Sequence, residues 1–216
     1  MIVAKLKVTY NSPVVLTFAL AAVGVFILTW AVPDVKYWFA ASPHLDGARS
    51  YAGISTHILG HASWQHLIGN FMFILLLGPI LEERHGSMKL LVMILVTALV
   101  TGIFNLAFMS SYLVGASGIV FMMILLASTA NIRQGEIPLT FIAVAVVYLG
   151  GELVAAFRDD GISHLAHLVG GASGAMLGFI GARRRGAGPL VIGKKPEAGL
   201  PKAKVPAQVA APKKTA

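Results

Sequence analysis

Four polar residues whose side chains could take part in a reaction occur in a largely apolar chain: Ser117, His167, His66 and Asn70. A serine hydroxyl becomes a nucleophile when a base lies within about 2.6 to 3.2 Å and accepts its proton. A histidine in an apolar wall stays neutral, because burial disfavours the charged form, so it can act as that base. The tetrahedral oxyanion that follows attack needs hydrogen-bond donors aimed at it. His66 and Asn70, four residues apart on one helical face, fit that role.

Two histidines, His164 and His167, compete for the role of base. A stripe of glycines continues the helix face that carries the second of them: Gly170, Gly174 and Gly178. Such a stripe lets two helices approach closely, and we expect the partner to be the helix that begins at Ser117. His167 is therefore the predicted base, while His164 is expected nearer the surface. Phe121, one turn below Ser117, is a candidate ring to stack on the imidazole.

The backbone N–H of Ser117 is a further donor for the oxyanion if the residue begins a helix, where the helix dipole is positive. No Asp or Glu is expected at the depth of His167, since Asp159 and Asp160 fall in a predicted outer loop. These positions favour a Ser–His dyad over a triad. A lone serine in a membrane helix more often bonds to its own backbone, so the hypothesis rests on the residues lying together.

The elements that would hold these residues are membrane helices. Of the 216 residues, 56% are hydrophobic and only 12% are charged, against about 25% charged in an ordinary soluble domain. The chain contains no cysteine, which excludes disulfides, thiolate metal sites and a cysteine nucleophile. Its 23 glycines are typical of helices that pack closely within lipid.

Six apolar segments are predicted to span the membrane as an all-α bundle: 14–32, 64–81, 89–108, 117–131, 139–156 and 164–181. Residues 1–13 form a short N-terminus, 14–182 the six-helix transmembrane domain, and 183–216 a basic disordered tail. With both termini cytoplasmic, 14 of the 17 Lys and Arg lie on the inner side. This positive-inside bias predicts a multi-pass protein with that orientation.

The fourth segment is unusually short. A helix over residues 117–131 rises about 21 Å, roughly 9 Å less than a hydrocarbon core of about 30 Å. It should therefore begin inside the membrane, at the end of a loop that lines a water-filled cavity. In this topology the second, fourth and sixth spans run from outside to inside, which brings Ser117, His66 and His167 to one level.

Four short motifs occur in order along this frame: His61-x4-His66-x3-Asn70, Glu82-x3-Gly86, Gly115-Ala116-Ser117-Gly118 and Ala166-His167-x2-Gly170-x3-Gly174. Together they resemble the rhomboid family of intramembrane serine proteases. The resemblance implies a six-helix core with Ser117 as nucleophile and His167 as general base. It also implies that His66 and Asn70 are oxyanion donors together with the Ser117 amide.

The same resemblance implies cleavage of peptide bonds in or near single transmembrane segments, with single-pass membrane proteins as substrates. No cofactor and no metal are expected, and the bacterial inner membrane is the expected location. The chain departs from the family pattern at Phe121, where many members have Tyr. It also lacks the Trp-Arg pair that many carry in the first outer loop, where Arg49 stands alone.

The sequence also allows three functions other than that of a protease. A catalytically inactive rhomboid-like protein would bind membrane clients without cutting them, and retention of Ser117 and His167 argues against it. A transporter or metal protein would use the histidines of the spans: His61, His66, His164 and His167. No carboxylate cluster accompanies them. Nucleic-acid binding lacks a folded basic face with interleaved aromatics, and the oligomeric state is left open.

Overall fold

The structure is a computed structural model, and it describes residues 9–129, 137–155 and 164–185. The regular secondary structure of the described residues is helical, apart from one isolated β-bridge between Ala41 and Leu113. Its helices, in order, are α1 (Pro13–Ala31), η1 (Pro33–Phe39), α2 (Ala48–Thr56), η2 (His57–Leu59), α3 (Trp64–His85), α4 (Ser87–Phe108), α5 (Ser117–Ser128), α6 (Leu139–Ala155) and α7 (His164–Arg185). The predicted disordered tail 183–216 is wrong at its start, because α7 continues to Arg185. The rest of that tail and the loop carrying Asp159 and Asp160 lie outside the described residues.

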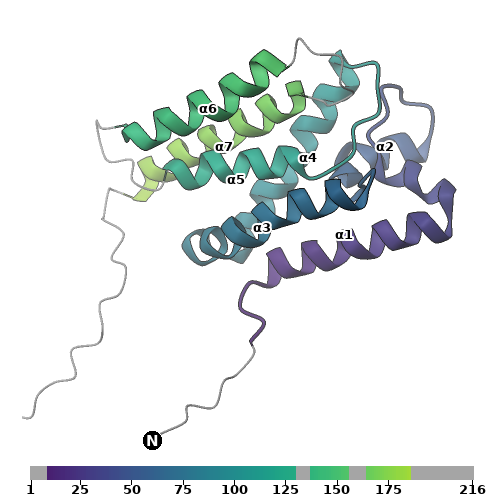
Figure 1. Ribbon diagram of the computed structural model, residues 1–216, viewed down its shortest axis with the longest axis horizontal. Helices are drawn as coiled ribbons and strands as arrows, with labels where there is room; N and C mark the ends of the chain where they lie inside the picture. Colours follow the sequence, from purple (N-terminus) through teal and green to yellow (C-terminus); the bar gives the residue numbers. More distant parts are fainter. Residues whose placement is uncertain (1–8, 130–136, 156–163, 186–216) are drawn as a thin grey trace, which may run out of the picture.

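The helices form a bundle with α5 at its centre. Figure 1 shows α5 between α3 and α7, with α1 on the far side of α3 and α6 on the far side of α7. Among the described residues, three helices are long and apolar enough to cross a membrane, namely α1, α3 and α4. The apolar parts of α5, α6 and α7 are shorter. Each of the six begins within two residues of its predicted segment.

The central helix α5 begins at Ser117, as the sequence predicts, and has 12 residues. At about 1.5 Å per residue it is about 18 Å long, too short to span a hydrocarbon core of about 30 Å. Most of its side chains are buried: Ile119, Val120, Met122, Met123, Ile124, Leu125 and Leu126. A short helix is thus enclosed by longer ones, which protects its ends from lipid.

The closest packing in the bundle joins α5 to α7. A Cβ at Gly170 would collide with the backbone of Gly118, and a Cβ at Gly174 would collide with the backbone of Met122. Each contact therefore requires glycine, because only the absence of a side chain lets the two backbones meet. The contacts advance together along both helices, so α5 and α7 run parallel. The predicted partner of the glycine stripe is confirmed.

A buried carboxylate attaches α1 to α3. Glu82, near the end of α3, accepts hydrogen bonds from the backbone N–H groups of Val14 at 3.0 Å and Val15 at 3.1 Å. Both donors belong to the first turn of α1, where backbone N–H groups lack helical partners and the helix dipole favours negative charge. One turn earlier in α3, the missing side chain of Gly78 makes room for Val15.

The segment 33–63, the first outer loop, folds into η1, α2 and η2. It is joined to the loop before α5 by two backbone hydrogen bonds between Ala41 and Leu113, of 2.9 and 3.0 Å. The side chain of Asn105, on α4, donates to the carbonyls of Ala41 at 3.2 Å and Ser111 at 3.0 Å. The outer segment is therefore a brace for the loop that leads to Ser117.

Candidate functional site

Ser117 is the first residue of α5 and is half-buried. The preceding residue, Ala116, occupies the N-cap and offers no capping side chain, so the first amides of the helix remain available as donors. Gly115 has a φ of 110°, a conformation that suits glycine alone, and it turns the chain into the helix. The nucleophile candidate therefore sits on a sharp turn with donors beside it.

His66 and Asn70, on α3, border this turn. A Cβ built on Gly115 would lie 2.5 Å from Cε1 of His66, 2.6 Å from its Nε2 and 3.5 Å from Nδ2 of Asn70. Asn70 is 7% exposed, and its Nδ2 has no hydrogen-bond partner among the described residues. A buried donor without a partner is costly, and here it lies next to the turn that carries Ser117.

His167, on α7, is held against α5 by an aromatic ring. Phe121 stacks on its imidazole with ring centroids 4.8 Å apart and planes 9° from parallel. Phe121 lies one turn after Ser117 on the same helix, and the Gly118–Gly170 contact joins the two helices beside it. The structure thus has the stacking contact expected from the sequence, at the level of the first turn of α5.

His164 is expected nearer the membrane surface than His167, and it lies one turn before His167 at the start of α7, where its side chain is 7% exposed. Its ring lies edge-on to that of His167, with centroids 6.0 Å apart. The start of α7 is covered where Ala166 packs in a small apolar cluster with Ala41 and Leu113. This cover comes from the two braced loops, so it was invisible in the sequence of α7 itself.

His57 lies beside the site, but its position in the sequence does not indicate a role there. It lies in η2, outside the spanning helices, and is 2% exposed. Its Nδ1 donates to the carbonyls of Gly53 at 3.2 Å and Ile54 at 3.1 Å, since carbonyls only accept. Burial lowers its pKa from 6.5 to about 4, so the ring is neutral. Its own carbonyl accepts from the N–H of Gly115 at 3.0 Å.

His57 therefore fixes the turn before Ser117 through the backbone. Its other ring nitrogen, Nε2, lies 3.3 Å from Oγ1 of Thr101 on α4. No pattern in the sequence marks this residue, because the contacts join segments more than forty positions apart, as for His57 and Thr101. Only a polar residue type in an outer loop hints at it.

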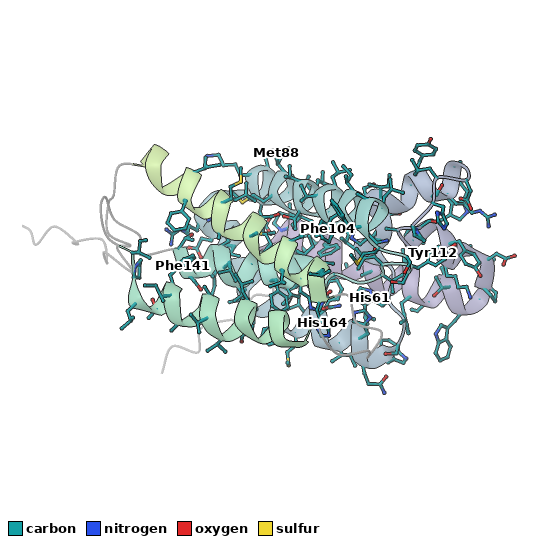
Figure 2. All side chains as sticks on the ribbon, turned by 90° about the horizontal axis from the view of Figure 1, so that it is seen from above. His61, Met88, Phe104, Tyr112, Phe141 and His164 are labelled. Atoms are coloured by element: carbon teal, nitrogen blue, oxygen red, sulfur yellow. The ribbon has the colours of Figure 1, made fainter. Side chains whose placement is uncertain are left out.

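A cavity of about 480 Å³ adjoins the site. It lies between the end of α1, η1 and the loop before α5, and its lining includes Phe26, Trp30, His61 and Val114. The ring of His61 lies edge-on to that of His66, 5.1 Å away. Figure 2 shows His61 and His164 toward the same end of the bundle, with Phe141 toward the other. The cavity provides room beside the proposed donors.

Metal ligation was the remaining alternative for the histidines. Within residues 9–129, 137–155 and 164–185, no three His, Cys, Asp or Glu side chains lie close enough to hold a metal ion together. The described arrangement instead places a serine at a helix start, a ring-stacked histidine and a buried amide donor around one turn. Those are the components of nucleophilic acyl transfer.

Comparison with known proteins gives matches that cover most of the chain. A family model described as Rhomboid domain matches residues 48–184. Rhomboid-related protein 1 of Caenorhabditis elegans is 31% identical over 138 residues, which is 58% of this chain and 38% of that protein. Rhomboid protease GlpG of Enterobacter sp. (strain 638) is 28% identical over 181 residues, 80% of this chain and 66% of that protein. The matches thus span less than two thirds of either relative.

Proposed function

This chain belongs to the rhomboid family, it is an integral membrane protein, and we propose that it acts as an intramembrane serine endopeptidase with a Ser117–His167 dyad. The proposal is supported by the residues around the first turn of α5. His66 and Asn70 border the position that a side chain of Gly115 would take, two residues before Ser117, and Phe121, one turn after Ser117, stacks on His167. The position of His66, Asn70 and His167 around the turn that begins α5 at Ser117 is the observation that supports the proposal.

The proposed reaction has two halves. Ser117 Oγ attacks the carbonyl carbon of the scissile peptide while His167 accepts the hydroxyl proton. The oxyanion receives hydrogen bonds from the Ser117 amide, from Asn70 Nδ2 and from His66. Collapse breaks the C–N bond, and His167 returns its proton to the departing amine. Water, activated by the same imidazole, then hydrolyses the acyl ester and restores the serine.

The substrates we propose are single-pass membrane proteins, cut in or near their transmembrane segments. An α5 of 12 residues supports this location, because a helix that short begins below the membrane surface when its other end reaches the opposite side. In the proposed topology the chain crosses the membrane six times, with residues 14–182 as the protease domain and both termini in the cytoplasm. The bacterial inner membrane is its proposed location.

The test is labelling of the purified protein with a fluorophosphonate probe, together with cleavage of a fluorescent transmembrane substrate. We expect Ser117→Ala and His167→Ala to lower turnover by about a thousandfold or more. His164→Ala is the matched control, since His164 is also a buried histidine on α7, and it should keep most activity. If His164→Ala is inactive and His167→Ala is active, the base has been assigned to the wrong histidine.

The same experiment separates the protease from the other functions considered. Folded wild-type protein that takes no label and cuts no membrane substrate would be an inactive, client-binding relative. Activity abolished by a chelator but retained by Ser117→Ala would indicate a metal mechanism instead.

A further inference from the structure

A second cavity lies outside the proposed active site. Its volume is about 550 Å³, within the range of about 300 to 1,000 Å³ usual for small-molecule sites. It is formed by η1, the start of α2 and the loop before α5. Its lining includes a cation, a carboxylate and three aromatic rings: Arg49, Asp46, Tyr37, Trp38 and Tyr112. None of these residues takes part in the proposed peptide cleavage.

The cavity lies at the boundary between membrane and water. The helices α1 and α4 are both long and apolar enough to span, and the three cavity aromatics follow within seven positions of their ends at Ala31 and Phe108. Tyr37, Trp38 and Tyr112 are exposed there. Exposed Tyr and Trp at the ends of spanning helices are typical of the headgroup layer, so lipid headgroups are the molecules at this level.

The charged and aromatic groups of the cavity are close together. The guanidinium of Arg49 lies 5.9 Å from the centre of the Tyr37 ring. The rings of Tyr37 and Tyr112 are 6.2 Å apart and inclined by 58°. Arginine binds phosphate oxygens with two parallel hydrogen bonds, whereas ammonium groups are attracted to aromatic faces and to carboxylates such as Asp46. The cavity therefore suits a ligand that carries both charges.

We propose that this cavity binds the headgroup of a zwitterionic phospholipid, with the phosphate on Arg49 and the ammonium group among the aromatic rings and Asp46. Phosphatidylethanolamine has this chemistry. The occupant contacts both segments that the Ala41–Leu113 bridge joins, because Tyr112 belongs to the loop that leads into α5. A bound lipid thereby braces the loop before Ser117 from the membrane side.

The test measures lipid retention by native mass spectrometry on the full-length protein in detergent, titrated with short-chain lipids. The three ligands are phosphatidylethanolamine, phosphatidylglycerol, which lacks the ammonium group, and diacylglycerol, which lacks the phosphate as well. We expect affinity to fall in that order. Arg49→Gln should weaken phosphatidylethanolamine binding about tenfold, the value of one charge-assisted hydrogen bond.

Lys89→Gln is the matched control, because it removes one positive charge from an exposed side chain at the start of α4, the opposite end from the cavity. It should leave binding unchanged. Asp46→Asn provides a second, independent variant, which should weaken phosphatidylethanolamine without weakening phosphatidylglycerol. Thermal unfolding midpoints equal to that of the wild type show that each variant is folded.

Four results would overturn the proposal. The first is equal affinity for all three lipids, and the second is an equal loss in Arg49→Gln and Lys89→Gln. The third is binding of soluble phosphoethanolamine as tightly as the lipid, which would identify a free metabolite as the occupant. Tighter binding of phosphatidylglycerol than phosphatidylethanolamine would also contradict it, because an anionic site would then explain the data without Asp46.

Discussion

The helices α1 and α5 are both composed almost wholly of apolar residues, yet they occupy opposite situations in the bundle. On α1 only Val15, Phe18, Ala22 and Phe26 are buried, and outward residues such as Leu20 are 66% exposed. On α5 seven of the 12 residues are buried, and the others after the first turn are half-buried. Figure 1 shows the same contrast, with α1 at the edge and α5 enclosed.

Apolar character therefore does not distinguish an edge helix from a central one in a membrane protein. Lipid tails are as apolar as a protein core, so leucine gains little by moving from one to the other. What separates the two helices is the way they are held. The edge helix is attached at one end by a carboxylate, whereas the central helix is clasped by glycines along its length.

The largest effect is expected when the central contact is broken. Gly170→Ala places a methyl group in the backbone of Gly118, so α5 and α7 must separate, and overpacking of this kind costs about 1 to 3 kcal/mol. Because Ser117 and His167 lie on those two helices, activity should fall about a hundredfold for a displacement of roughly 1 Å. Thermal unfolding and substrate cleavage measure the two losses.

Gly24→Ala on α1 is the control for that substitution, since nothing lies within 4 Å of a Cβ there. It should leave both stability and activity near those of the wild type. Equal losses in the two variants would show that glycine contacts do not distinguish the centre from the edge.

Acid should loosen the brace around the centre. The pKa of His57 is lowered by burial from 6.5 to about 4. Between these values the unfolded chain binds a proton that the folded chain does not, so the free energy of unfolding falls as the pH drops from 6.5 to 4. The loss from His57 alone reaches about 3 kcal/mol at the lower limit.

Unfolding of wild type and His57→Gln, measured at pH 7 and at pH 4.5, checks this expectation. The variant should be less stable at pH 7 but lose less stability on acidification. His61, which lies just before α3, also has a pKa lowered by burial to about 4, so part of the pH dependence remains. An identical pH dependence in both proteins would contradict the role given to His57.

The attachment of α1 is a smaller contribution. Glu82→Ala leaves the N–H groups of Val14 and Val15 without their acceptor, at a cost of about 1 to 3 kcal/mol. The exposed neighbour Glu83 provides the control, since Glu83→Ala removes the same charge from the surface. Denaturation should distinguish the two variants, and equal stability would mean that packing alone holds α1 in place.

The smallest effect is expected on the outer face of α1. Leu20→Ala shortens a side chain that is 66% exposed, so the unfolding free energy should change by less than about 0.5 kcal/mol. A loss of several kcal/mol would indicate that this face is covered by a protein partner. The comparison with α5 would then need revision.

The starts of the six apolar helices and the residues grouped around the first turn of α5 were predictable from the sequence alone. A polar residue is expensive within an apolar membrane helix, and a glycine there permits close packing, so Ser117, His167 and the glycine stripe carried positional information. The start of α5 at Ser117, its contact with α7 and the stacking of Phe121 on His167 all agree with those expectations. The catalytic roles assigned to these residues stay predictions.

Only the tertiary structure decided which helix is central, why His164 is buried and what His57 does. These features depend on pairs far apart in the chain, such as Ala41 with Leu113 and Val14 with Glu82. Helical periodicity reports the faces of one helix, and lipid hides the difference between an inward and an outward apolar face. The fold of segment 33–63 depends on distant contacts in the same way, because α2 lies against α4.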